Sequence, residues 1–385
     1  MGRSDTALQH QESDRKGGSR YVVRHDPMTT FILRRLALAI PVLIGILIVT
    51  FFLARLIPGE PCTATLGERA TPAMCEAFYI RYGLNEPLFQ QFLSYAGRIM
   101  SGDLGDSIRY AVPVSSLLAE RLPLTIELAF FALFFAIIVG IPLGILSAYR
   151  RNSSADVLTM LVANIGVSMP VFWLGLMLAF IFGVVLKDTP FALPPSGRLP
   201  SGFNAAPFYV AWGLAPDSAS ATPLMIFISR LYTLNAILTL NGELFVQSIR
   251  YLILPAIAVG TISMSVIARM TRSSVLETLN QDYVRTARAK GLSERTVVSR
   301  HAVRNALLPV VTVIGLNFGL LISGAVLTET IFGLSGVGRT LYDGITARDY
   351  PLVQGFTVVI AASFVLINLG IDILYGYLDP RIRLS

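Results

Sequence analysis

The chain alternates between long apolar runs and polar segments, and this alternation predicts its architecture. Six of the runs are long enough to cross a bilayer, because a membrane-spanning helix needs about 20 mostly apolar residues. We predict spans over residues 36–54, 124–148, 157–186, 252–268, 310–327 and 352–377. Residues 224–240 are less apolar and contain Arg230 and Asn235, so we predict an interfacial or packed helix there and no seventh span. The expected fold is an all-α membrane protein with six transmembrane helices.

The polar segments define the other regions of the chain. Residues 1–28 lack the apolar core of a secretory signal, and we predict a disordered cytoplasmic tail there. Residues 58–121 and 188–250 are long and rich in turn-forming residues, and they are predicted to be two external regions. Residues 272–308 form a long basic loop on the other side of the membrane.

The distribution of basic residues orients the chain. Most of the 31 Lys and Arg residues lie in the tail, in the turn after the second span, in the 272–308 loop and at the C-terminus. Cytoplasmic loops carry an excess of Lys and Arg. We therefore predict a multi-pass protein of the cell (inner) membrane with both termini in the cytoplasm.

The composition agrees with a membrane location. Hydrophobic residues make up 54% of the chain, charged residues only 14%, and the mean hydropathy is +0.63. The formal net charge of +7 could suggest a nucleic-acid partner. Its basic residues flank apolar spans, however, so membrane orientation explains them better and no nucleic-acid partner is expected.

The basic loop contains a predicted helix-turn-helix over residues 282–309. Asp282 places a carboxylate at the start of a first helix, and Gly291 is placed as the left-handed residue that ends it. Ser293 is predicted to cap a second helix, and Pro309 to open the next apolar run. A loop that only reconnects two spans can be much shorter, so we interpret this element as a docking site. Composition alone leaves open that its charges serve only orientation.

Few residues suggest chemistry within the membrane. Glu127 lies near the start of the second span, where the positive end of a helix can hold a carboxylate, and we favour this structural role over a substrate or proton site. Asp372 is predicted to lie at the membrane interface. Several glycines and prolines in the spans are expected to allow close helix packing rather than to act as hinges. They are Pro41, Gly45, Gly140, Pro142, Gly144 and Pro170.

The two cysteines are the remaining candidates for a metal site or a disulfide. With only Cys62, Cys75 and three histidines in the chain, no metal site is expected. Both cysteines fall in the first external region, on the oxidising side of the predicted topology, and we predict that they form a disulfide. Two unpaired thiols remain the alternative, because sequence does not define their separation.

Several sequence blocks together resemble the B-type permease subunits of ATP-binding-cassette importers for dipeptides and oligopeptides. The resemblance covers about residues 31–383. It is carried by FILRRL at 31–36, LIPG at 56–59, GDLG at 102–105 with PV at 113–114, SMP at 168–170, RMTRSS at 269–274, DYVRTARAKGL at 282–292, RNALLP at 304–309, TETIF at 328–332 and RDYP at 348–351. Mild departures include Ser335-Gly336 where the family commonly has Pro-Gly.

This resemblance implies a permease transmembrane domain over residues 29–383, of the type I importer architecture. It implies that the 272–308 loop is the coupling loop, whose first helix sits in a groove on an ATP-binding subunit. The implied ATPase-coupling residues are Asp282, Tyr283, Arg285, Thr286, Ala287, Arg288, Ala289, Lys290, Gly291 and Leu292. As candidates for lining the translocation path we name Ser168, Met169, Pro170, Met264, Asn317 and Glu329.

The resemblance also implies a set of partners. These are a homologous C-type permease, two ATP-binding subunits, an external peptide-binding protein and membrane lipid. No lysine directly follows a glycine, so the phosphate-binding loop of an ATPase is missing. We expect this chain to be a non-enzymatic subunit without a bound cofactor, with ATP and Mg²⁺ on the partners.

Other functions have less support in the sequence. An intramembrane hydrolase would need a His-Glu-x-x-His or Gly-x-Ser-x-Gly pattern, and neither occurs. A secondary transporter would usually show intramembrane charges and repeated halves. Within the importer class, glutathione, nickel chelates and short oligosaccharides remain alternatives to dipeptides and longer peptides.

Overall fold

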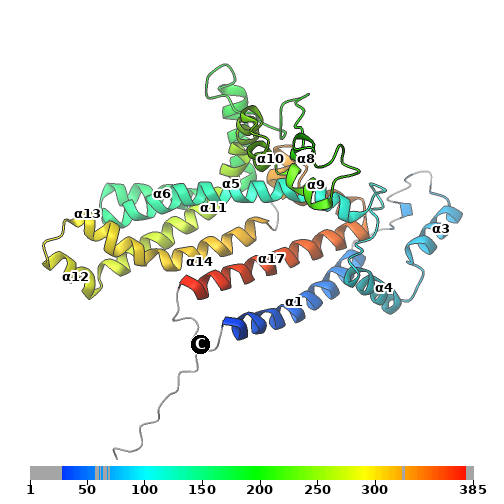
Figure 1. Ribbon diagram of the computed structural model, residues 1–385, viewed down its shortest axis with the longest axis horizontal. Coiled ribbons are helices and arrows are strands. Elements are labelled where there is room, and N and C mark those ends of the chain that lie inside the picture. The colour runs from blue at the N-terminus through cyan, green and yellow to red at the C-terminus, as the bar shows by residue number, and fades with distance from the viewer. Residues whose placement is uncertain are drawn as a thin grey trace, which may run out of the picture.

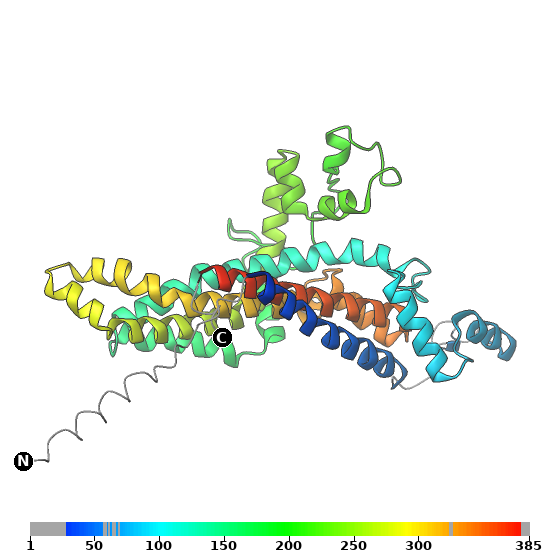
Figure 2. The ribbon, with the colours of Figure 1, turned by 60° about the horizontal axis from the view of Figure 1, so that its bottom comes forward.

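The computed structural model is an elongated bundle of helices (Figures 1 and 2). It describes residues 28–56, 60, 62–63, 67, 70–322 and 326–378. The predicted tail at residues 1–27 and the motif residues 57–59 lie outside this part. The described residues contain helices and one isolated bridge, between Asp106 and Pro113, and no named strand. The expected all-α fold is confirmed.

The elements follow one another along the chain with these bounds. They are α1 (Met28–Leu56), α3 (Pro72–Tyr82), α4 (Leu88–Met100), α5 (Val114–Tyr149), α6 (Ser154–Ser168), α7 (Val171–Phe180) with a π-helical end (Ile181–Val185), α8 (Phe208–Ala211), α9 (Pro223–Arg230), α10 (Tyr232–Leu238), α11 (Gly242–Leu279), α12 (Asp282–Ala289), α13 (Glu294–Thr296) with a π-helical continuation (Val297–Ala302), α14 (Val303–Ile322), α15 (Val326–Ile331), α16 (Val337–Thr346) and α17 (Tyr350–Leu378).

Five helices of the described chain are long and apolar enough to cross a membrane, and a bent helix pair brings the number to as many as six. The predicted continuous span over residues 157–186 is wrong, because α6 and α7 meet at an angle of 104°. Pro170 lacks an N–H and disfavours helical geometry in the residue before it. Met169 accordingly has an extended backbone (φ −77°, ψ 128°). Pro170 is therefore a break in the helix, and the packing role predicted for it is wrong.

Two further predicted boundaries differ from the structure. The second and fourth spans are parts of longer helices, α5 and α11, which have 36 and 38 residues. Residues 323–325 of the predicted fifth span lie outside the described residues; α14 is described to Ile322 and α15 from Val326.

The core of the bundle is the long contact between α5 and α11. Glycines let the two backbones approach closely: a Cβ atom at Gly140 would lie 2.8 Å from the Met264 carbonyl oxygen, and one at Gly144 2.5 Å from that of Ala268. Small residues are typical of such helix contacts in membranes. The packing role predicted for these two glycines is confirmed.

The segment predicted to be the first external region packs through α4 on the end of α1. The hydroxyls of Thr50 and Tyr95 lie 3.3 Å apart, and the rings of Phe51 and Phe92 lie edge to face at 5.2 Å. This contact holds α4 against α1. Figure 1 shows α3 and α4 at one end of the molecule and α12 and α13 at the other.

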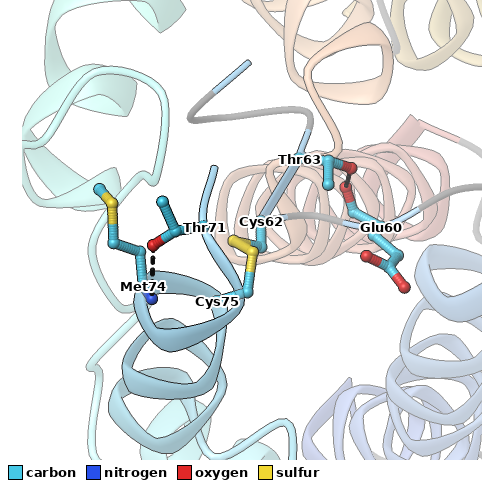
Figure 3. Close-up of a disulfide and its surroundings, with 6 residues drawn as sticks. All are labelled: Glu60, Cys62, Thr63, Thr71, Met74 and Cys75. Atoms are coloured by element: carbon cyan, nitrogen blue, oxygen red, sulfur yellow. Dashed lines mark hydrogen bonds between the residues drawn. A yellow bond between two sulfur atoms is a disulfide. The ribbon is translucent and has the colours of Figure 1, made fainter. Parts of the chain in front are cut away.

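A disulfide joins Cys62 to Cys75 of α3 in the same region (Figure 3). The Cα atoms of the two residues are 5.5 Å apart. Thr71 begins α3, and its hydroxyl accepts a hydrogen bond from the Met74 amide at 3.3 Å. The capped helix thus presents Cys75 from its first turn to the chain near Cys62.

The segment predicted to be the second external region contains a small helical cluster of α8, α9 and α10, whose labels lie together in Figure 1. Asn235 is fully buried in this cluster, where its side chain accepts a hydrogen bond from the Phe208 amide at 2.8 Å and donates one to the Ala206 carbonyl at 3.0 Å. The expected packed helix over residues 224–240 is present as two short helices.

Glu127 ties this cluster to the bundle. Its carboxylate pairs with Arg198 at 2.8 Å and accepts hydrogen bonds of 2.7 Å from the amide and the hydroxyl of Thr233. The structural role predicted for Glu127 is present, but its predicted cause is wrong. Because α5 begins at Val114, Glu127 lies well inside the helix and is held by partners from the external region, away from a helix end.

Candidate functional site

The candidate coupling site is the segment from α12 to α14 at one end of the bundle (Figure 1). α12 begins at Asp282, as predicted, and has one apolar face. Val284 and Ala287, three residues apart, lie on this face and pack against Val297 and Leu279. The short helix is therefore fixed to the helices on either side of it.

The turn after α12 depends on Gly291. This residue has a φ of +78°, a left-handed conformation that favours glycine, and its amide donates to the Arg288 carbonyl at 2.9 Å. The predicted role of Gly291 in ending the helix is confirmed.

An ion pair closes the turn. The Arg288 guanidinium contacts both carboxylate oxygens of Glu294, at 2.7 and 3.1 Å. The hydrogen bond to Glu294 raises the pKa of Arg288 above its usual value. Both side chains are about half exposed, so the pair defines the geometry more than it adds stability.

The second helix differs from the prediction at both of its ends. Ser293 occupies the cap position, but its hydroxyl pairs with that of Thr296 at 2.9 Å, and the predicted side-chain cap is absent. Pro309 lies inside α14 and does not begin it. One continuous helix runs from Glu294 to Ile322. The turn is therefore connected to the apolar bundle by one continuous helix.

A hydrogen bond strengthens this connection. The Asn305 amide donates to the Tyr283 hydroxyl at 2.8 Å, which fastens the start of α12 to α14. The sequence analysis did not pair these two residues, which are 22 positions apart.

The predicted coupling residues form an exposed surface, with one exception. All ten are exposed apart from Ala287, which faces inward and is 6% exposed. Ala287 therefore cannot meet a partner as a contact residue without rearrangement of the loop, while Ala289 can. Beside this surface lies a cleft of about 200 Å³, lined by Ala148, Tyr149, Arg151, Leu276, Leu279, Asn280, Arg288, Glu294 and Val298.

A buried ion pair that sequence reasoning missed anchors the helix leading into this site. Arg272 of α11 contacts both carboxylate oxygens of Asp156, at 2.9 and 3.0 Å. Ser147 at the end of α5 also donates to Asp156, and the Asn152 amide does so at 3.0 Å. One carboxylate thus joins α5, α6 and α11. Its only signal in the sequence was a lone acid beside the basic turn, and we interpreted Arg272 as orientation charge.

The six path candidates do not form one surface within this chain. Ser168 and Pro170 are exposed and Met169 is half-buried at the break between α6 and α7. Met264 and Asn317 are buried, at 5% and 9% exposure, and the Asn317 amide donates to the Val313 carbonyl in its own helix. Only the residues at the helix break are accessible from outside the subunit.

Glu329 is fully buried and has a structural role in this chain. Its carboxylate accepts hydrogen bonds of 2.8 Å from the Thr125 hydroxyl and the Arg339 amide, and it thereby holds the start of α16. A Cβ atom at Gly336 would lie 2.3 Å from the carboxylate, so glycine is needed there. A larger residue in place of Gly336 would displace the Glu329 side chain.

Comparison with known proteins identifies the family. Residues 140–384 match the binding-protein-dependent transport system inner membrane component, and residues 28–129 match the N-terminal part of such membrane components. A dipeptide transport system permease protein DppB from Alkalihalophilus pseudofirmus is 45% identical over 92% of this chain and 100% of its own length.

Two further relatives are similar along their length. DppB of Escherichia coli (strain K12) and the di/tripeptide transport system permease protein DppB of Pseudomonas aeruginosa (strain UCBPP-PA14) are each 44% identical over 92% of this chain and 99% of their own length. With these matches and the apolar helices of the bundle, the chain belongs to the binding-protein-dependent transport system inner membrane components, a family of multi-pass permease subunits.

Proposed function

We propose that this chain is the B-type permease of an importer that carries dipeptides across the cell membrane, with ATP hydrolysed by two separate subunits. The substrate follows from the relatives, whose names specify dipeptides or di/tripeptides. An external binding protein delivers the peptide, and a homologous C-type permease supplies the other half of the path.

The proposed coupling rests on one observation: α12 has an exposed surface and is held in place by contacts with the helices next to it. Val284 packs into the loop core, Tyr283 is bonded to α14, and α14 continues from Glu294 into the bundle. A rigid-body movement of an ATP-binding subunit against α12 would displace α11 and α14 together. Such a displacement can switch a path between two orientations.

The proposed topology places the coupling site in the cytoplasm. α3 and α4 lie at the opposite end of the molecule, where the disulfide between Cys62 and Cys75 fits an oxidising compartment (Figures 1 and 3). Both termini are then cytoplasmic.

The decisive experiment is reconstitution. The chain is co-expressed with its C-type permease and its ATP-binding subunits, and the purified complex is placed in liposomes with the binding protein outside and ATP inside. We expect uptake of a labelled dipeptide that requires ATP and persists after ion gradients are collapsed. Uptake that stops with the gradient would contradict the proposal in favour of a secondary transporter. Glutathione, a nickel chelate and a short oligosaccharide serve as competing substrates.

A further inference from the structure

A polar pocket of about 290 Å³ is lined by residues from the end of α1, the α3–α4 region and the start of α17. Figure 1 shows these elements at the end of the molecule opposite α12. Three arginines line it, Arg55, Arg81 and Arg98, together with a single acidic residue, Glu86. None of the three arginines has an ion-pair partner within 4.0 Å among the described residues. The pocket therefore has an excess of positive charge.

Arg55 is the central group of this pocket. Its guanidinium lies 3.5 Å from the centre of the Phe51 ring, and it donates to the Gln91 side-chain oxygen at 2.6 and 3.1 Å. Burial lowers the pKa of Arg55 to about 10. A partly buried cation that has only neutral partners is costly, and an anion beside it would offset that cost.

A second observation is independent of the arginines. Gln354 of α17 also lines the pocket, is 6% exposed, and its side-chain nitrogen has no acceptor among the described residues. Buried donors are nearly always hydrogen-bonded. An oxyanion in the pocket would supply an acceptor for Gln354 and charge for Arg55 and Arg98 at once.

Exposed apolar side chains lie beside the pocket and on the opposite face of α4. Leu88 of α4 is 57% exposed and borders the pocket, and Leu56 at the end of α1 follows Arg55 and is 74% exposed. Phe89 and Leu93, 70% and 53% exposed, lie on the other face of α4, so this helix has a pocket-lining face and an exposed apolar face. Leu88 lines a neighbouring hollow that Arg55 also lines, so apolar rim and basic pocket are continuous. Apolar helix faces beside basic groups are typical of the membrane interface.

We propose that this pocket binds the phosphate group of an anionic phospholipid in the outer leaflet. Arginine forks match the geometry of phosphate oxygens, and the exposed apolar side chains of α4 can contact the acyl chains. The pocket volume of about 290 Å³ lies just below the roughly 300–1,000 Å³ of small-molecule sites, which suits a headgroup. The excess of arginine over glutamate favours a lipid with net negative charge over a zwitterionic one.

The test is lipid retention by the full-length chain. The protein is purified from nanodiscs of phosphatidylglycerol and phosphatidylcholine in equal amounts, and bound lipid is counted by native mass spectrometry. We expect retained phosphatidylglycerol, and at least a roughly tenfold loss of it in the double variant Arg55→Gln/Arg98→Gln. Arg109→Gln is the matched control, because Arg109 is an exposed arginine of the same region outside the pocket, and should retain the lipid.

A second variant distinguishes loss of lipid binding from misfolding of the protein. Gln354→Leu removes the unpaired donor without changing the charge, and we expect weaker retention at an unchanged unfolding temperature in phosphatidylcholine. Equal retention of the two lipids, or retention unaffected in both pocket variants, would overturn the proposal. Thermal stabilisation by inorganic phosphate in the absence of selective lipid retention would also overturn it, since it would assign the pocket to a free anion.

Discussion

At the scale of single residues, Gly291 has the most direct link to the proposed function. Its left-handed backbone sets the direction in which α13 leaves α12. A β-branched residue is strongly disfavoured at a φ of +78°. No neighbouring atom lies within 4 Å of a Cβ built at this position, so the effect of a substitution would come from backbone strain alone.

We therefore expect Gly291→Val to abolish peptide uptake while the protein remains inserted in the membrane. Uptake is measured in vesicles at matched expression, and binding of the ATP-binding subunits by co-purification. Gly213→Val is a suitable control, because Gly213 also has a positive φ of 68° but lies in the external cluster region. Normal uptake by the Gly291 variant would contradict the coupling role.

Asp156 is the second residue for which the structure predicts a large effect. Removal of one partner of a buried ion pair leaves the other charge uncompensated, at a cost of about 3 kcal/mol or more; the partial exposure of Arg272, 30% of its side chain, places the expected loss at the lower end. We expect Asp156→Asn to lower the unfolding temperature and the uptake rate together. Glu277→Gln, at an exposed position of the same helix as Arg272, should change neither.

At the scale of elements, the contact between α5 and α11 depends on glycine. We expect Gly144→Leu to separate the two helices, because even its Cβ atom would lie 2.5 Å from the Ala268 carbonyl. The result should be a loss of folded protein, seen as early elution or aggregation on size exclusion in detergent. Gly45→Leu in α1 is the control, since a Cβ there would meet nothing within 4 Å.

The disulfide is the second feature at this scale. Cys62 and Cys75 are 13 positions apart, and a loop of this length predicts a stabilisation of roughly 2–4 kcal/mol in the chain-entropy model. We expect the Cys62→Ala/Cys75→Ala variant to lower the stability of the external region, measured by its susceptibility to limited proteolysis. Alkylation of both cysteines in unreduced protein, detected by mass spectrometry, would contradict the bond itself.

At the scale of the whole molecule, the coupling site and the disulfide lie at opposite ends (Figures 1 and 2). The proposed orientation, which puts these two features on opposite sides of the membrane, requires this separation. The polar tail at residues 1–27 lies outside the described residues and is absent from the matched family regions, which begin at residue 28.

Deletion of residues 1–27 is therefore expected to leave assembly and uptake intact. The truncated and complete chains are compared by co-purification with the partner subunits and by peptide uptake. A truncation that inserts normally but no longer assembles would show that the tail is a contact surface.

Local signals in the sequence predicted much of this protein. Long apolar runs indicated the helices because backbone groups in lipid must be paired within the segment. A glycine between two helical patterns indicated the turn at Gly291, and the topology brought Cys62 and Cys75 to one external region. Each of these predictions depends on neighbours along the chain.

The tertiary structure decided what depends on residues distant in the sequence. It places Pro170 at a break of 104° yet leaves Pro309 inside a helix. The packing around each proline determines whether a broken or a continuous helix has the lower free energy. It pairs Asp156 with Arg272 and Glu127 with Arg198 across 116 and 71 positions, and it buries Glu329 below the start of α16. Hydropathy identifies a charge in an apolar setting, but only three-dimensional packing provides the partner that makes its burial stable.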